Sequence, residues 1–202
     1  MIHALVLAAG ESKRMGMPKP LLRFGDATFL EQIIAVLRRS GVDGITVVLG
    51  ARADLIRASI DLSGTNVVIN EDYRKGQLSS LIAGLKNVPA GAHAIILCLV
   101  DNPSISAGVV NGLVDGFRKT GKPIVLPVFD GRRGHPALFA RSLFDELANA
   151  PMEKGARHVV SSNRDKVLEV DVHDRGILTS IDTPQDYRSC FGAEPQVISK
   201  KP

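Results

Sequence analysis

The first twenty residues, from Met1 to Pro20, read M-I-H-A-L-V-L-A-A-G-E-S-K-R-M-G-M-P-K-P. An apolar segment without polar alternation leads into two alanines and a glycine, and Lys13, Arg14 and Lys19 follow closely. Continuous apolar residues are typical of a strand that is buried on both faces. Glycine lets a ligand approach the main chain, whose amide groups can bind phosphate oxygens. The stretch therefore predicts a buried strand that runs into an anion-binding loop.

Similar apolar, β-branched runs recur along the chain and predict further strands buried on both faces, at residues 45–50, 66–70, 94–100 and 123–128. Helical patterns lie between them, at residues 28–41, 53–60, 77–85 and 106–118. This alternation predicts a three-layer α/β/α sandwich around a mostly parallel, Rossmann-like sheet. Ligands bind such sheets at the carboxyl ends of the strands. Further along, G-R-R-G-H-P-A-L-F predicts a turn into a short strand, and residues 142–150 predict a helix.

The helix patterns carry their own start and stop signals. Thr28 and Glu31 have the spacing of a capping box, and Gly41 is expected to stop the first helix. Ser106 is expected to cap the helix over residues 106–118. These signals support the assignment of helices between the strands.

Length and composition indicate one globular domain. The chain has 202 residues, 45% of them hydrophobic and 23% charged, which argues against disorder or a fibre. We expect a single domain over residues 1–193 and a polar C-terminal tail over 194–202. The formal net charge is +4, but the basic residues are scattered and there are two tyrosines and no tryptophan. This composition favours a basic pocket for a small polyanion over a nucleic-acid surface.

The cysteines and the hydropathy bear on location. Cys98 and Cys190 form no metal-binding or disulfide pattern, which fits a reducing compartment, so a cytoplasmic protein is expected. No apolar stretch reaches the ~18 residues that a membrane-spanning helix needs, and no membrane partner is expected.

The segment L-A-A-G-E-S-K-R-M-G-M-P-K-P, at residues 7–20, carries the most specific signal. It lacks the ending of a Walker A loop, and the chain has no G-x-G-x-x-G motif. From spacing alone, a glycine turn with solvated lysines is an equally good interpretation. However, the segment resembles the signature loop L-A-A-G-x-S-x-R-M-G-x-x-K of the MobA-like nucleotidyltransferases. The resemblance to the molybdenum cofactor cytidylyltransferase branch of that family extends to about Tyr187.

The resemblance implies a fold of the nucleotide-diphospho-sugar transferase type and a nucleotide site at the loop. The main chain would contact base and ribose at Leu7, Ala8, Ala9 and Gly10. Arg14 and Lys19 would hold the triphosphate and act in catalysis. Branches that take guanine typically read L-A-G-G here, and those that take cytosine read L-A-A-G. Ala9 therefore favours cytidine, because its methyl group narrows the space beside the base edge.

Two carboxylates follow short apolar runs and are candidate metal ligands. Mg²⁺ is commonly bound by one or two carboxylates, with phosphate oxygens and water as further ligands. Asp101 closes the apolar run A-I-I-L-C-L-V and is the acid of the segment L-V-D-N-P, where it could also simply cap a turn. Asp182 lies in S-I-D-T-P-Q-D-Y, where it could also be the N-cap of a helix, with Asp186 as a surface acid. Resemblance to the family segments L-V-D-Q-P and D-I-D-T-P-E-D-Y implies that Asp101 and Asp182 bind Mg²⁺ and that Asp101 is catalytic.

Three further segments are candidates for substrate contacts. Gln77 and Ser80 open a helix, where free amides favour an anion or a polar base edge, although a serine-capped helix also explains them. Resemblance to the family segment G-M-x-x-S-L implies that both contact base and ribose. His135 lies in a segment that resembles R-G-H-P of the cytidylyltransferase branch, which implies that it binds the terminal phosphate or the pterin of the acceptor; as a lone histidine it could also be structural. Arg157 lies in M-E-K-G-A-R-H-V-V, which resembles the family's G-D-x-G-A-R-x-L-L but departs from it at Met152 and Glu153. Arg157 is a candidate anion contact, and a surface salt bridge would explain it equally well.

These residues together suggest one reaction. The acceptor's phosphate oxygen would attack the α-phosphorus of a nucleoside triphosphate, and pyrophosphate would leave. The resemblance implies CTP and molybdopterin as substrates, with a molybdenum enzyme receiving the product. Three alternatives stay open: guanylyl transfer to the same acceptor, nucleotidyl transfer to a sugar or alcohol phosphate, and a non-catalytic molybdenum cofactor carrier or chaperone.

Overall fold

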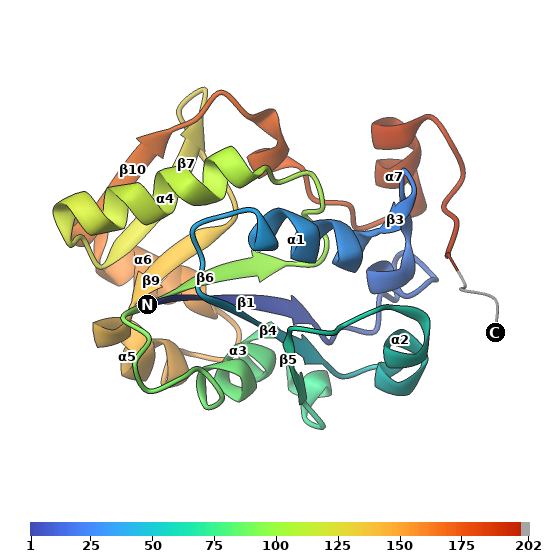
Figure 1. The fold of residues 1–202 in the computed structure, drawn as a ribbon, viewed down its shortest axis with the longest axis horizontal. Coiled ribbons are helices and arrows are strands. Elements are labelled where there is room, and N and C mark those ends of the chain that lie inside the picture. The colour runs from blue at the N-terminus through green and yellow to red at the C-terminus, as the bar shows by residue number, and fades with distance from the viewer. Residues whose placement is uncertain (199–202) are drawn as a thin grey trace.

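The computed structural model describes residues 1–198 and is built on one large mixed sheet (Figure 1). The sheet has eight strands. Seven of them are neighbours in the order β10-β7-β9-β6-β1-β4-β5, and β8 pairs with β7. In chain order the strands are β1 (Ile2–Ala8), β4 (Gly44–Leu49), β5 (Asn66–Ile69), β6 (Ala94–Leu99), β7 (Ile124–Phe129), β8 (Arg132–Arg133), β9 (Ala137–Ala140) and β10 (Val167–Asp171). A separate antiparallel pair consists of β2 (Arg23–Phe24) and β3 (Ala27–Thr28).

The pairing confirms the predicted mostly parallel sheet. Strand β1 lies parallel between β4 and β6, β4 pairs in parallel with β5, and β7 pairs in parallel with β10. Strand β9 is the exception, because it runs antiparallel between β6 and β7. The short strand predicted after G-R-R-G-H-P is thus the element that joins the two parallel parts of the sheet.

Helices cover both faces of the sheet, so the predicted three-layer sandwich is confirmed (Figure 1). One face packs against α1 (Phe29–Arg38), α2 (Ala53–Ser59) and α4 (Ala107–Thr120). The other face packs against α3 (Gln77–Leu85), α5 (Phe144–Ala148) and α6 (Ala156–Ser162). Single 3₁₀ turns connect these elements, namely η1 (Lys19–Leu21), η2 (Tyr73–Lys75), η3 (Arg141–Leu143), η4 (Arg164–Lys166) and η5 (Arg175–Leu178). Among the described residues, no helix is long and apolar enough to cross a membrane.

Burial of both faces explains why the strands lack polar alternation. All seven residues of β1 are buried; Ala4 and Val6 join the core on one side of the sheet, and Leu5 and Leu7 join the core on the other. The expectation of full burial is wrong for β5, whose residues are half-buried or exposed. The reason is topological, because β5 is the last strand of the sheet and has a neighbour on one side only.

The capping predictions hold with one exception. Thr28 Oγ1 accepts the amide of Glu31, and Glu31 Oε2 accepts the amide of Thr28, so the capping box is formed. Ser106 caps α4 by accepting the amide of Val109. Gly41 does not stop α1, which already ends at Arg38. Its amide donates instead to Asn111 Oδ1 on α4, so Gly41 fixes the following turn against that helix.

An aromatic cluster joins the C-terminal part of the chain to the β2–β3 pair. Helix α7 (Pro184–Phe191) lies beside β3 in Figure 1. It contributes Tyr187 and Phe191, which pack against Phe24 and Phe29. Beyond α7, the carbonyl of Gln196 accepts the amide of Arg23, and the amide of Ile198 donates to the carbonyl of Leu21. The first part of the predicted tail is therefore paired with the segment next to η1; residues 199–202 lie outside the described residues.

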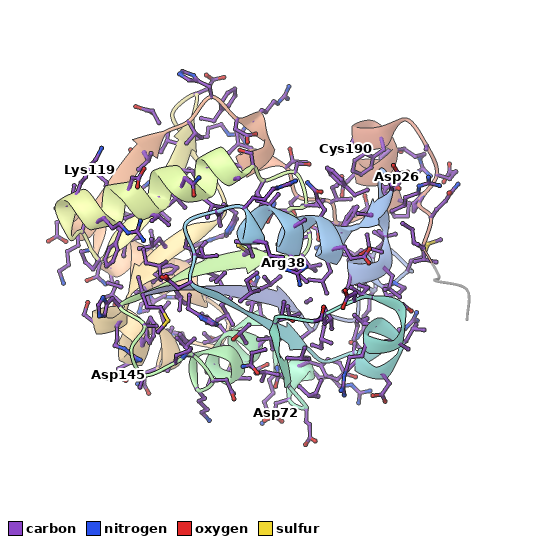
Figure 2. The ribbon with its side chains drawn as sticks, viewed as in Figure 1. Asp26, Arg38, Asp72, Lys119, Asp145 and Cys190 are labelled. Carbon is purple, nitrogen blue, oxygen red and sulfur yellow. The ribbon has the colours of Figure 1, made fainter. Side chains whose placement is uncertain are left out.

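Charged side chains are dispersed over the outer surface, as the scattered basic residues of the sequence predict. Figure 2 shows Asp72, Lys119 and Asp145 at the periphery of the molecule, and all three are exposed. Asp72 directly precedes η2, Lys119 lies in α4 and Asp145 lies in α5. The charges that matter for function are those that meet at the carboxyl ends of the central strands.

Candidate functional site

Two neighbouring strands bring the first site residues together. Strands β1 and β6 are parallel, and Leu7 is paired with Leu99. Ala9 and Asp101 each lie two residues further along, so the anion loop and the first carboxylate leave the sheet side by side. This is the edge at which parallel α/β sheets bind ligands.

The loop after β1 folds back on itself. The carbonyl of Ser12 accepts the amides of Met15 and Gly16 at 3.1 and 3.0 Å, and both Ser12 and Gly16 have positive φ. Ser12 Oγ accepts the amide of Lys19 at 3.1 Å. A side chain at Gly10 would project into open space, so this backbone is accessible to a ligand. The loop thus combines accessible backbone with cations, as the sequence predicts.

Lys19 lies between the two candidate metal ligands. Its Nζ atom is 2.6 Å from Asp182 Oδ1 and 3.5 Å from Asp101 Oδ2, and its side chain is only 11% exposed. Arg14 Nη2 reaches the same oxygen of Asp182 at 3.0 Å. Burial opposes ionisation of Asp182, but the hydrogen bond from Lys19 and the charges of Lys19 and Arg14 hold its pKa below the usual value. Asp182 is therefore ionised and faces two cations.

Asp182 is not the N-cap of α7. Thr183 is the cap: its Oγ1 accepts the amide of Asp186 at 3.2 Å, and Asp186 Oδ2 accepts the amides of Thr183 and Asp182 at 2.8 and 3.0 Å. Asp186 therefore completes a capping box and is more than a surface acid. Because these two residues cap the helix, the carboxylate of Asp182 is left for the cations. The amide of Ile181 donates to the carbonyl of Asp101 at 2.9 Å, which holds the two carboxylate-bearing loops together.

The carboxylates also fit a divalent cation. Asp101 Oδ1 is buried and has no hydrogen-bond partner within residues 1–198. Within the same residues, no group of three or more histidine, cysteine or acidic side chains could hold a metal, so Asp101 and Asp182 are the candidate pair. One or two carboxylates, with phosphate oxygens and water, are a usual ligand set for Mg²⁺.

A cavity of about 370 Å³ opens beside this cluster. Nine of the residues predicted from the sequence line it: Leu7, Ala9, Gly10, Arg14, Lys19, Gln77, Ser80, Asp101 and Asp182. The side chain of Ala8 packs in the core instead, so only its main chain is near the ligand space. The structure therefore brings residues from four distant parts of the chain into one cavity.

Ser80 is held by a residue that sequence reasoning missed. The side-chain nitrogen Nδ2 of Asn70 donates to Ser79 Oγ at 2.9 Å and to Ser80 Oγ at 3.0 Å, and all three side chains are buried. Neither serine caps α3; its N-cap is Gly76, which makes no side-chain cap. Because Ser80 accepts from Asn70, its hydroxyl proton can be donated into the cavity. The signal that could have identified Asn70 in the sequence is that this polar residue directly follows the β-branched run of β5.

Tyr73 is a second residue that was missed. It lines the cavity, and a side chain at Gly50 would come within 2.7 Å of Tyr73 Cβ and 2.8 Å of the carbonyl of Ala9. Gly50 is thus needed for Tyr73 and the anion loop to pack together. The sequence signal for this packing is Gly50, which directly follows the apolar run of β4.

A second cavity, of about 610 Å³, adjoins the first and shares Leu7, Gln77 and Leu99 with it. His135 and Arg157 line it, together with Glu153. Burial lowers the pKa of His135, with the charge of Asp101 acting in the opposite direction, and its Nδ1 is buried without a partner in the described chain. A neutral imidazole is therefore available to a ligand in this cavity. The remaining two predicted contacts thus lie together, next to the first cavity and not in it.

The site combines cations, carboxylates and free backbone beside two joined cavities, on the ligand-binding edge of an α/β sheet. The comparisons with known proteins give the family. Residues 4–167 match the MobA-like NTP transferase domain, and the chain belongs to that nucleotidyltransferase family. Its fold is shared with the nucleotide-diphospho-sugar transferases.

Several curated relatives cover nearly the whole chain. A nicotine blue oxidoreductase of Paenarthrobacter nicotinovorans is 30% identical over 93% of this chain and 95% of its own length. A probable molybdenum cofactor guanylyltransferase of Mycobacterium avium is 29% identical over 93% and 94%. A molybdenum cofactor cytidylyltransferase of Escherichia coli is 26% identical over 92% and 93%. These relatives thus carry names for guanylyl transfer, for cytidylyl transfer and for an oxidoreductase.

Solved structures agree. The crystal structure of Rv0371c from Mycobacterium tuberculosis superimposes with a TM-score of 0.84 at 35% identity, covering 95% of this chain and 97% of that one. A structure of the same relative in complex with manganese gives 0.79 at 33% identity, covering 95% and 98%. Manganese is therefore present in a structure of a protein that is similar to this chain in fold and sequence.

Proposed function

We propose that the protein is an Mg²⁺-dependent cytidylyltransferase that transfers CMP from CTP to the terminal phosphate of molybdopterin and releases pyrophosphate. The observation that carries this proposal is the pair of joined cavities. The first contains the anion loop, two cations and two carboxylates; the second contains His135 and Arg157. Membership of the MobA-like family supports it.

The site residues have distinct roles in this proposal. Base and ribose contact Gln77, Ser80 and the main chain from Leu7 through Ala8 and Ala9 to Gly10. Arg14 and Lys19 bind the triphosphate and stabilise the charge that develops as pyrophosphate leaves. Mg²⁺ on Asp101 and Asp182 would supply further neutralisation of phosphate charge.

The acceptor side needs positioning more than base catalysis. A phosphate acceptor is already ionised at neutral pH, so its oxygen can attack once it is held in line. His135 and Arg157 bind and orient the acceptor in the second cavity. The neutral state of His135, caused by burial, makes it a hydrogen-bonding group and not a charged one.

The remaining expectations are part of the same proposal. Residues 1–193 act as a single catalytic domain in the cytoplasm, and the product passes to a molybdenum enzyme. The free cysteines, buried Cys98 and exposed Cys190, need no oxidising compartment in this proposal.

The first test is direct. The purified protein, Mg²⁺, molybdopterin and either CTP or GTP are mixed, and pyrophosphate is measured. Release with CTP at least tenfold faster than with GTP supports the proposal. Faster release with GTP assigns the protein to guanylyl transfer, as in the Mycobacterium avium relative. Nucleotide binding without pyrophosphate supports a carrier, and no response to either nucleotide contradicts both.

A further inference from the structure

The free protein neutralises its own site. Both cations proposed to bind phosphate already contact the carboxylates proposed to bind the metal: Lys19 contacts Asp101 and Asp182, and Arg14 contacts Asp182. The cationic and anionic halves of the site therefore face each other. A cation that binds the carboxylate oxygens contacted by Lys19 and Arg14 competes with these two side chains.

Lys19 is a fixed part of this arrangement. Its backbone amide is bound by Ser12 Oγ, and it opens η1 between two prolines, Pro18 and Pro20. The Lys19 side chain is 11% exposed, against 70% for Arg14 and 80% for the nearby Lys13. Lys19 is thus the one of these three cations that is held inside the site by the fold.

The Lys19 ammonium lies 2.6 Å from Asp182 Oδ1 and 3.5 Å from Asp101 Oδ2, so it already neutralises both carboxylates that would hold a divalent cation. Mg²⁺ binds oxygen at 2.0–2.1 Å, so a divalent ion on the same two carboxylates would be close to the ammonium. Like charges in contact repel strongly at a partly buried site. The ammonium and the divalent ion are therefore competitors for Asp101 and Asp182.

We propose that Lys19 is the resident counter-ion of Asp101 and Asp182 and excludes divalent cations until the phosphates of the nucleotide draw its ammonium away. Metal and nucleotide then bind cooperatively, and the free protein binds metal weakly. This inference rests on the proposed nucleotide and metal site. It adds an order of events: the metal enters with the nucleotide, and not before it.

The decisive experiment measures Mn²⁺ binding to the free protein by electron paramagnetic resonance, without nucleotide or acceptor. Mn²⁺ is a suitable probe because it also prefers oxygen ligands. Lys19→Met keeps the length and apolar stem of the side chain but removes its charge. We expect this variant to bind Mn²⁺ at least tenfold more tightly than the wild type, in line with the effect of one contacting charge.

Lys13→Met is the matched control. Lys13 lines the same cavity but is paired with Glu11 and contacts neither carboxylate. We expect its Mn²⁺ affinity to change less than threefold. Equal Mn²⁺ affinities of the wild type and Lys19→Met overturn the proposal. An equal increase in Lys19→Met and Lys13→Met also overturns it, because the increase would then be an effect of net charge. If the double variant Lys19→Met/Asp101→Asn lacks the increased Mn²⁺ affinity of Lys19→Met, the increase is due to binding at the carboxylate pair.

A measurement on the wild type alone needs no variant to fold. Mn²⁺ affinity is determined with and without a non-hydrolysable CTP analogue, after subtraction of the metal that the analogue binds in solution. We expect the analogue to raise the affinity of the protein for Mn²⁺ at least tenfold, and Mn²⁺ to raise the affinity for the analogue by the same factor. Independent binding of the two overturns the proposal.

The two proposals fail in different ways. If the proposed function is wrong, pyrophosphate is not released, but the wild type and Lys19→Met still differ in Mn²⁺ affinity. If the present inference is wrong, pyrophosphate is released normally, and Mn²⁺ binds the free wild-type protein as tightly as it binds Lys19→Met.

Discussion

Lys19 is the residue on which the proposed chemistry depends most. It is buried beside two carboxylates, and its charge would stabilise the leaving pyrophosphate. We predict that Lys19→Ala lowers kcat by about 10²-fold or more, the scale seen when one preorganised charge-stabilising group is lost. Steady-state pyrophosphate release checks this, with circular dichroism to confirm folding.

Lys119→Ala is the matched control for that measurement, because Lys119 is exposed near the end of α4 (Figure 2) and does not line either cavity. Its turnover is expected to equal that of the wild type. Near wild-type turnover of Lys19→Ala would remove Lys19 from the mechanism.

Ala9 tests base selection at the scale of a single methyl group. It is 3% exposed and lines the first cavity directly after β1. We predict that Ala9→Gly lowers the ratio of kcat/KM for CTP over GTP by about tenfold, which corresponds to about 1.4 kcal/mol. The reason is that removal of the methyl group widens the space beside the base edge. An unchanged ratio would mean that base choice is made elsewhere in the cavity.

At the scale of elements, the start of α7 separates two functions that the sequence places next to each other. Asp186 caps the helix, whereas Asp182 faces Lys19 and Arg14. We predict that Asp186→Ala lowers the free energy of unfolding by about 1 kcal/mol, as is usual for a lost cap. Asp182→Asn is expected to lower turnover at least tenfold with a smaller change in stability. Urea unfolding and pyrophosphate release measure the two effects.

A reversal of these two outcomes would contradict the assignment. Loss of stability in Asp182→Asn with normal turnover would make Asp182 a structural residue. Loss of turnover in Asp186→Ala at full stability would place Asp186 in the site.

The elements themselves differ in how far the sequence predicts them. Strands β1 and β6 are predicted well, because burial on both faces produces continuous apolar runs in each. Strand β5 has a similar run but lies at the edge of the sheet, and strand order is not encoded in a single strand's pattern. Gly41 has the composition of a helix stop, but α1 ends earlier, because the turn after it is fixed by a tertiary bond to Asn111.

The same distinction holds for the site in the whole molecule. The anion loop is local and is visible in residues 7–20 alone. Asp101 and Asp182 are far apart in sequence, and only the resemblance to a family pairs them before the structure is known. The contact between Ile181 and Asp101 is tertiary, as is the bond from Asn70 that orients Ser80. Such contacts leave no periodic signal, which is why Asn70 and Tyr73 were missed.

Stability of the whole molecule should depend on His3, which lies in the buried first strand. Its Nε2 is 2.8 Å from Thr46 Oγ1, and its Nδ1 is buried without a partner among the described residues. Burial lowers the pKa of His3 below the usual 6.5, although the charge of Asp43 opposes this. Since the unfolded chain then binds the proton more tightly, unfolding is favoured as pH falls.

The contribution of His3 to the free energy of unfolding is therefore complete above about pH 6.5 and decreases as pH falls from there toward the lowered pKa. We predict that the wild type loses stability in urea between pH 7 and pH 5, and that His3→Gln, which can keep the bond to Thr46, loses less. His173→Gln is the matched control, because His173 is exposed and follows β10 at the other edge of the sheet. Equal pH dependence of wild type and His3→Gln would show that the buried first strand does not set the acid limit of this fold.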